Sequence, residues 1–198
     1  MDAMEDYRDE IKRMRRIADM LCTAHSVEHE RFHRRALILD AVTMLVSLYL
    51  VSMVFVDPVL NNKLTPRDWS PVIWTGVLAV VTFGLSVVQL IVNWKGRADA
   101  HGRSLGIYSE AKSNCIEVLN GTTAVSREEF NRVRARYDMA GDVGIRIPDR
   151  RFLKLKQKHL VKVEISKLLD ERPALSFFKV RMGMWWRDNF SKKRDAGT

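Results

Sequence analysis

Two apolar stretches decide the fold of this 198-residue chain: ALILDAVTMLVSLYLVSMVFV at residues 36–56 and PVIWTGVLAVVTFGLSVVQLIVNW at residues 71–94. At about 1.5 Å per helical residue, each can cross a hydrocarbon core about 30 Å thick. The connection, residues 57–70, is short and contains Pro58 and Pro66. We therefore predict an all-α membrane protein: a two-transmembrane helical hairpin whose long cytoplasmic helical extensions form a bundle.

The charges beside the two stretches predict the orientation of the hairpin. Cations flank both stretches on the side of the arms, whereas the loop offsets Lys63 and Arg67 with two aspartates. Because cytoplasmic flanks are enriched in Lys and Arg, we expect a multi-pass protein with both termini in the cytoplasm. Tryptophans would mark the outer interface (Trp69, Trp74) and the inner one (Trp94). The flanking cations are Arg31, Arg34, Arg35, Lys95, Arg97 and Arg103.

The net charge of +9 comes mostly from the C-terminal arm, which has 23 Lys/Arg and 13 Asp/Glu from residue 95 onward. Such an excess is typical of a cytoplasmic flank, and it is also typical of a nucleic-acid-binding surface. No nucleic-acid motif accompanies the charge, so the sequence favours the first interpretation over direct nucleic-acid binding. The lipid membrane is the partner that the sequence predicts most directly.

The chain divides into four segments. Residues 1–35 form a cytoplasmic N-terminal helix and residues 36–94 the hairpin. Residues 95–172 form a cytoplasmic helical domain, and residues 173–198 an aromatic and basic tail. From residue 1 to residue 56 there is neither Gly nor Pro, so we predict one helix that runs from the arm into the membrane. The charged first segment lacks the short apolar core of a cleavable signal.

Small and polar side chains follow one stripe on each span, at alternating steps of three and four residues. Such a stripe lets helices approach closely and hydrogen-bond in lipid. It also suits the lining of a water-filled path between several copies of the chain. Both interpretations stay open, and either predicts a homo-oligomer. The candidate pore-lining or subunit-contact residues are Asp40, Thr43, Ser47, Thr75, Thr82, Ser86, Gln89 and Asn93.

Asp40 is the single ionisable residue within the two spans, about one turn from the cytoplasmic end. Because an unpaired carboxylate is costly away from water, Asp40 needs a partner or contact with water. In an antiparallel hairpin Gln89 and Asn93 reach a similar depth and can hydrogen-bond it, while Arg35 or Lys95 can reach it by snorkelling.

The titratable residues do not form a catalytic or metal-binding pattern. His25, His29 and His33 repeat every four residues, which could place two imidazoles on a zinc ion, but no further ligand completes the set. Cys22 and Cys115 match no metal spacing. We find no phosphate-binding loop and no nucleophile with a base, and therefore expect a protein that is not an enzyme and has no cofactor.

Helix signals divide the C-terminal arm. After Trp94 we expect the helix to continue to Asn120-Gly121. Ser126 and Glu129 form a capping box that opens the next helix, which we expect to end at Gly141. Asp149 would cap a last long helix that Pro173 ends.

The tail combines aromatic residues with cations, including Lys192–Arg194. This mixture suits a membrane surface, a groove on a partner, or packing within its own domain. The candidate contact residues are Phe177, Phe178, Trp185 and Trp186.

A charged helix, two spans with a short loop, and a return helix reading WKGRADAHGRSLGIYSEAKSNCIEVL (residues 94–119) together resemble the SLATT domain. This is the SMODS and SLOG-associating two-transmembrane effector domain. The resemblance covers about residues 5–170 and is clearest in the spacing of His101, Leu105 and Tyr108. It implies that these three residues belong to the core of the cytoplasmic helices.

The resemblance also implies a function. It suggests a pore-forming effector of bacterial antiviral defence that disrupts the inner (cell) membrane and causes abortive infection. A companion nucleotide synthase, sensor or reverse transcriptase, or a nucleotide second messenger, would supply the signal. The alternative is a non-conducting membrane anchor that recruits partners through its basic cytoplasmic helices.

Overall fold

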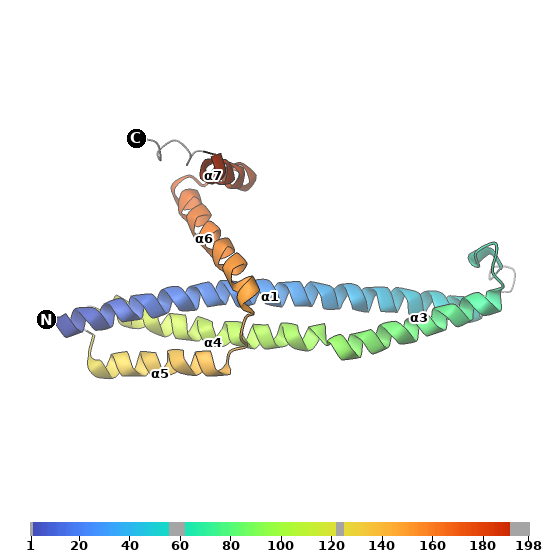
Figure 1. Cartoon of the computed structure of the whole chain (residues 1–198), viewed down its shortest axis with the longest axis horizontal. Coiled ribbons are helices and arrows are strands. Elements are labelled where there is room, and N and C mark those ends of the chain that lie inside the picture. The colour runs from blue at the N-terminus through green and yellow to red at the C-terminus, as the bar shows by residue number, and fades with distance from the viewer. Residues whose placement is uncertain (1, 56–61, 122–124, 191–198) are drawn as a thin grey trace. The chain divides into compact units, whose positions relative to one another are not determined.

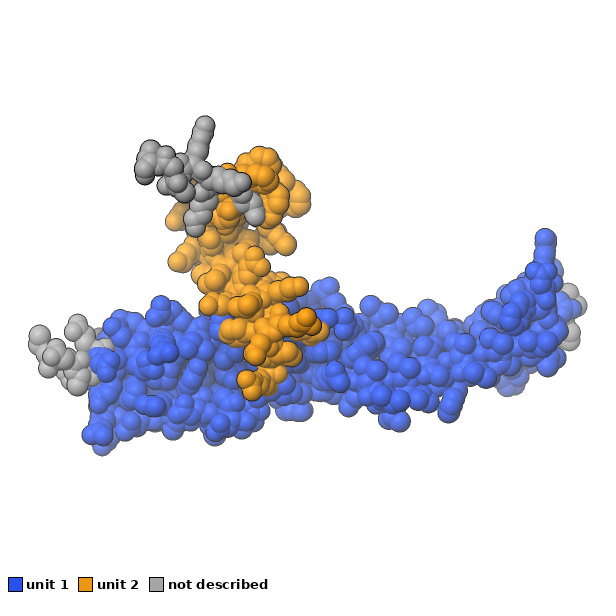
Figure 2. Space-filling view, viewed as in Figure 1, with its two compact units in different colours: residues 1–145 blue, residues 146–198 orange. Residues whose placement is uncertain are grey.

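The computed structural model describes residues 2–55, 62–121 and 125–190, and about 89% of these residues are helical (Figure 1). This part of the chain contains no β-strand, which confirms the all-α prediction. Two compact units, residues 1–145 and 146–198, are distinguished in Figure 2. The boundary therefore falls inside the segment 95–172. Residue 56, the loop residues 57–61 and the tail cations Lys192–Arg194 lie outside the described residues.

Helix α1, Asp2–Phe55, is the longest element of the first unit. Its 54 residues extend about 80 Å without interruption, as the lack of Gly and Pro predicted. The chain returns in α3, Pro71–Val92, and then in α4, Trp94–Asn120. Along its length α1 packs against both α3 and α4 (Figure 1). Helix α1 therefore contacts both helices of the return path.

The start of α3 has two local causes. Ser70 accepts a hydrogen bond from the backbone N–H of Ile73 at 3.4 Å, which satisfies a donor that the first turn leaves free. Pro71 occupies the beginning of the helix, where its missing N–H has no cost.

Asn93 separates α3 from α4. We expected one continuous helix here, and this prediction is wrong at a single residue, Asn93. Its φ of 45° and ψ of 51° are left-handed, a conformation that Asn tolerates better than most residues. Its N–H donates to Gln89 O, and its Oδ1 accepts from Gly96 N at 3.0 Å. A Cβ on Gly96 would lie 2.7 Å from the Asn93 side chain, so the glycine makes room for this cap.

Helix α5, Arg127–Val143, completes a three-helix arrangement with α1 and α4. The predicted capping box is confirmed: Ser126 N–H donates to Glu129, and Glu129 N–H donates to Ser126 Oγ. The predicted end at Gly141 is wrong, because the helix runs to Val143 and Gly144 N–H then donates to Ala140 O. A mid-helix glycine costs only about 1 kcal/mol, so Gly141 does not end α5.

The core of this three-helix arrangement consists of side chains from all three helices. Tyr7 stacks on Phe130 with ring centroids 4.7 Å apart. Ile11 and Cys115 are fully buried beside them. This apolar core fixes the register of α1 against α4 and thereby the pairing of groups farther along both helices.

The second unit contains α6, Asp149–Glu171, and α7, Phe177–Phe190. Helix α6 ends before Pro173, as predicted. The predicted cap by Asp149 is wrong: Pro148 holds the cap position, no side chain caps the helix, and Asp149 is the first helical residue. A carboxylate in the first turn still interacts favourably with the helix dipole.

Candidate functional site

The hairpin of α1 and α3 exposes its apolar side chains. Phe83 is 72% exposed and Leu90 82% exposed, and Ile38 and Met44 are similarly open. A helix of a water-soluble domain would bury such a surface. By length and composition, both α1 and the α3–α4 segment are apolar enough to span a membrane. The exposed surface of the hairpin is thus apolar enough for contact with lipid.

The hydroxyl groups of the predicted polar stripe bond mainly to their own helices. Thr43, Thr75 and Thr82 each donate to the carbonyl four residues earlier at 2.8 Å, and Ser86 donates to Thr82 O at 3.0 Å. Ser47 is half-buried. Since a back-bonded hydroxyl already has an acceptor, the four back-bonded groups require neither water nor a second helix as an acceptor.

Asp40 and Gln89 form the polar centre of the hairpin. Gln89 Nε2 donates to Asp40 Oδ1 across the two helices, so the expected pairing is confirmed for Gln89. Asp40 remains exposed on its other side. It lies five residues beyond Arg35, which corresponds to about 7 Å along the helix. Among the described residues, the Asp40 carboxylate therefore has Gln89 as its partner and an open face.

A groove of about 480 Å³ surrounds this pair. It brings together four of the eight predicted residues, while Thr43, Ser47, Thr75 and Thr82 do not line it. Asn93 also lines the groove, and its Oδ1 accepts a hydrogen bond from Gly96 N–H at the start of α4. Arg35 lies over the Trp94 ring at 5.9 Å, in a cation–π contact. The lining residues are Ala36, Leu39, Asp40, Ser86, Gln89, Leu90, Asn93, Trp94 and Lys95.

Aromatic residues also gather at the loop end of the hairpin. Tyr49 Oη donates to Leu64 O at 2.6 Å and lies 3.4 Å from Trp74 Nε1, while Trp69 meets Trp74 edge to face. The arm end has Trp94 under Arg35. Amphipathic rings at both ends of an apolar segment are typical of membrane interfaces. The role of Tyr49 was not anticipated from the sequence.

A buried histidine pair joins α1 to α4 beyond the hairpin. His25 Nδ1 and His101 Nδ1 are 3.0 Å apart, which requires one ring to donate and the other to accept. Tyr108 stacks on His25, and Phe32 stacks on His101. Burial, and then the neighbouring His101, lower the pKa of His25 to about 4. The His25 imidazole is therefore neutral at pH 7.

The other predicted core residues and histidines differ in burial and in the groups that they contact. His101 and Tyr108 are buried and Leu105 is half-buried. His29 Nδ1 lies 2.8 Å from Ala98 O, and His33 is exposed and stacks on His29. Within the described ranges, no group of three or more His, Cys, Asp or Glu side chains could hold a metal ion.

The predicted contact residues of the tail lie on α7. Phe177, Phe178, Trp185 and Trp186 are all more than half exposed. Trp185 and Trp186 both contact the Phe190 ring, with ring centroids 5.5 and 4.7 Å apart. A membrane surface, a partner and packing within the unit therefore all stay open as interpretations of the tail.

Comparison of the chain with protein-family models, with curated proteins and with solved structures finds no match.

Proposed function

We propose that this protein is a two-span membrane protein whose hairpin, α1 from about residue 36 together with α3, lies in the bacterial inner membrane. The supporting observation is the exposed apolar surface of both helices, with aromatic side chains at each end. Cations flank the arm ends, so the helical arms lie in the cytoplasm.

Copies of the chain assemble through the groove at Asp40. The observation that carries this step is a carboxylate with one amide partner and an exposed side, at about 7 Å along a membrane helix. In lipid such a group is stabilised when it faces protein or a water-filled cavity. Assembly around Asp40 and Gln89 would place the carboxylate against a neighbouring copy and beside a water-filled cavity.

The assembly acts as a membrane effector. A cytoplasmic signal, either a nucleotide second messenger or a companion protein, opens a path for ions past the carboxylate–amide pair and depolarises the cell. The resemblance to the SLATT domain supports a role in antiviral defence by abortive infection. The signal reaches the hairpin through α1 and α4, which connect the cytoplasmic helices to it.

The test compares ion leakage from proteoliposomes containing two double variants. Asp40→Leu/Gln89→Leu removes both members of the pair, so neither is left unpaired, and leakage should fall to the level of empty vesicles. Thr43→Val/Thr82→Val removes two hydroxyls that bond to their own helices and should leave leakage unchanged. Equal leakage from both variants under activating conditions would contradict a path through the groove.

The alternative function is a membrane anchor that recruits partners and does not conduct. One observation favours it: the hydroxyls of Thr43, Thr75 and Thr82 donate to carbonyls of their own helices, so these three groups do not need water. An anchor predicts that the unaltered chain leaks no ions when cells are infected by phage. It also predicts that Asp40→Leu/Gln89→Leu still recruits cytoplasmic partners to the membrane.

A further inference from the structure

The two units differ sharply in charge. Residues 1–145 contain 18 Lys/Arg and 18 Asp/Glu, whereas residues 146–190 contain 12 Lys/Arg and 5 Asp/Glu. The described part of the second unit therefore has a net charge of +7, out of +9 for the whole chain. Most of its cations are exposed, including Lys154, Lys156 and Lys158 of α6. The first unit is neutral, so the basic character belongs to α6 and α7.

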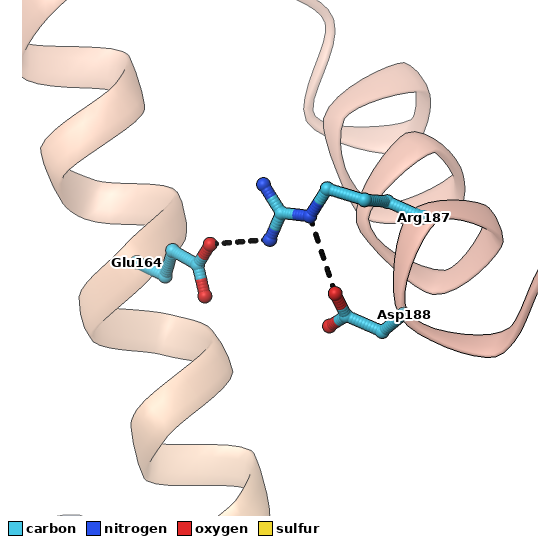
Figure 3. Close-up of polar contacts among 3 residues, drawn as sticks. All are labelled: Glu164, Arg187 and Asp188. Atoms are coloured by element: carbon cyan, nitrogen blue, oxygen red, sulfur yellow. Dashed lines mark hydrogen bonds and ion pairs between the residues drawn. The ribbon is translucent and has the colours of Figure 1, made fainter. Parts of the chain in front are cut away.

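Helix α7 turns its aromatic side outward. Its side toward α6 is held by Arg187, whose Nη2 donates to Glu164 Oε1 at 2.7 Å and whose Nε donates to Asp188 (Figure 3). Met184, one turn before Arg187, is buried. Phe178, Met182 and Trp185 recur at helical spacing on another face, and all three are more than half exposed.

This arrangement reverses that of a surface helix in a water-soluble protein, which turns its apolar side inward. The exposed face combines large rings, among them Trp186 at 62% exposure, with Lys179 and Arg181 on the same helix. Tryptophan and phenylalanine beside Lys and Arg are the residues of helices that lie in the headgroup region of a bilayer.

The chain leaves the first unit close to the membrane end of α4. Helix α5 returns along α4, and Ile145 N–H donates to Ser104 Oγ at 3.0 Å. Ser104 is eleven residues from Asn93, which corresponds to about 16 Å of helix. The second unit begins at Arg146, and α6 alone, with 23 residues, extends about 35 Å. The connection to the basic unit therefore leaves the first unit at a distance from Asn93 that is shorter than the length of α6.

We infer that the second unit is a peripheral module that binds anionic lipid headgroups, with the cations of α6 on the lipid phosphates and the exposed face of α7 in the headgroup region. The positive charge selects an anionic bilayer as the occupant of this surface. The inference rests on the membrane insertion proposed above and is independent of ion conduction.

The test measures tryptophan quenching by brominated lipids in nanodiscs that contain the full chain. Trp69→Phe/Trp74→Phe/Trp94→Phe leaves Trp185 and Trp186 as reporters of α7. A second variant keeps Trp74 alone and reports insertion of the hairpin. In mixtures of phosphatidylcholine and phosphatidylglycerol both reporters should be quenched. In pure phosphatidylcholine only Trp74 should be quenched, because docking of the module requires the anionic lipid.

Charge variants test the electrostatic origin of the binding. Neutralising Lys154, Lys156 and Lys158 to Gln should weaken docking of α7 about a hundredfold, since each cation near an anionic surface contributes about fivefold. Neutralising Arg127, Arg132 and Arg134 of α5 to Gln removes equal charge and should leave docking unchanged. Salt of about 1 M, where the Debye length is about 3 Å, should release α7.

Three outcomes would overturn the inference, and each is distinct. Quenching of α7 that is equal in neutral and anionic lipid would remove the role of charge. Quenching of Trp74 without quenching of α7 in either lipid would show that the tail faces protein or water. Absence of Trp74 quenching would reject membrane insertion itself. Trypsin should cleave the unaltered chain after Lys179 and Arg181 more slowly in anionic nanodiscs than in neutral ones. This measurement requires no substitution.

Discussion

The two halves of α1 face different surroundings, although they belong to one uninterrupted helix. The first half buries Ile11, Ala18 and His25 among α4 and α5 and pairs its polar groups across the helices. The second half exposes Ile38, Met44 and Val54. Both halves are equally helical, so helix propensity does not distinguish them. The pattern of buried and exposed apolar side chains does. Three predictions test this contrast, from the largest expected effect to the smallest.

The largest effect should come from the same substitution made in the two regions. Phe130 is 7% exposed and stacks on Tyr7, so Phe130→Ala should destabilise the packed helices α1, α4 and α5 by about 3–5 kcal/mol. At about 2–4 °C per kcal/mol, the melting temperature in detergent micelles should fall by roughly 10 °C. Phe83→Ala, at an exposed position of the hairpin, should change it little. Similar shifts for both would mean that the hairpin has a packed core of its own.

The second effect is a loss of stability in mild acid. The folded chain holds the pKa of His25 at about 4, below the ordinary value of about 6.5. The unfolded chain therefore binds a proton more readily between these values. The stabilisation is complete above about pH 6.5 and is lost as the pH falls toward 4, by on the order of 2–3 kcal/mol.

The groups around His25 define the control for this effect. His101, Tyr108 and the buried Glu28, which pairs with Arg31, lie on the two helices that form the site. His25→Phe/His101→Phe removes both imidazoles together and should flatten the dependence of the melting temperature on pH between about 4.5 and 6.5. A slope in this variant equal to that of the unaltered chain would assign the acid sensitivity to other groups.

The smallest effect distinguishes two glycines of α4. A Cβ at Gly96 would collide with the Asn93 side chain, and the lost cap, worth about 1 kcal/mol, should cancel the gain in helix propensity. A Cβ at Gly106 meets nothing within 4 Å, so Gly106→Ala should stabilise the helix by up to about 1 kcal/mol. Thermal unfolding should show a gain for Gly106→Ala alone. A gain for both would show that the Asn93 cap contributes little.

The sequence predicted the features that depend on long patterns. The apolar lengths identified both helices of the hairpin, and the absence of Gly and Pro before residue 56 predicted the continuity of α1. The features that depend on one residue were missed. Apolar periodicity continues across Asn93 and conceals a left-handed turn, and Gly141 resembles a helix end although α5 continues to Val143.

The histidine pair was missed for a different reason. His25, His29 and His33 were compared along one helix, whereas the partner of His25 lies 76 residues away. A signal was nevertheless present. The antiparallel register that pairs Asp40 with Gln89 also places residue 25 opposite the region of residue 101. Extending the register from the hairpin into the arms would have found the pair.

The left-handed residue Asn93 has a mechanical consequence. On the outward path, α1 is one rod with hydrogen bonds along its full length from arm to loop. The return path has a joint of one residue between α3 and α4, held by the Gln89 carbonyl and by Gly96. A tilt of the hairpin would strain α1 over many turns but could be absorbed on the return path by two dihedral angles. In such a tilt, α1 would be the stiff member, and the Asn93 joint would decide how far α4 follows the movement.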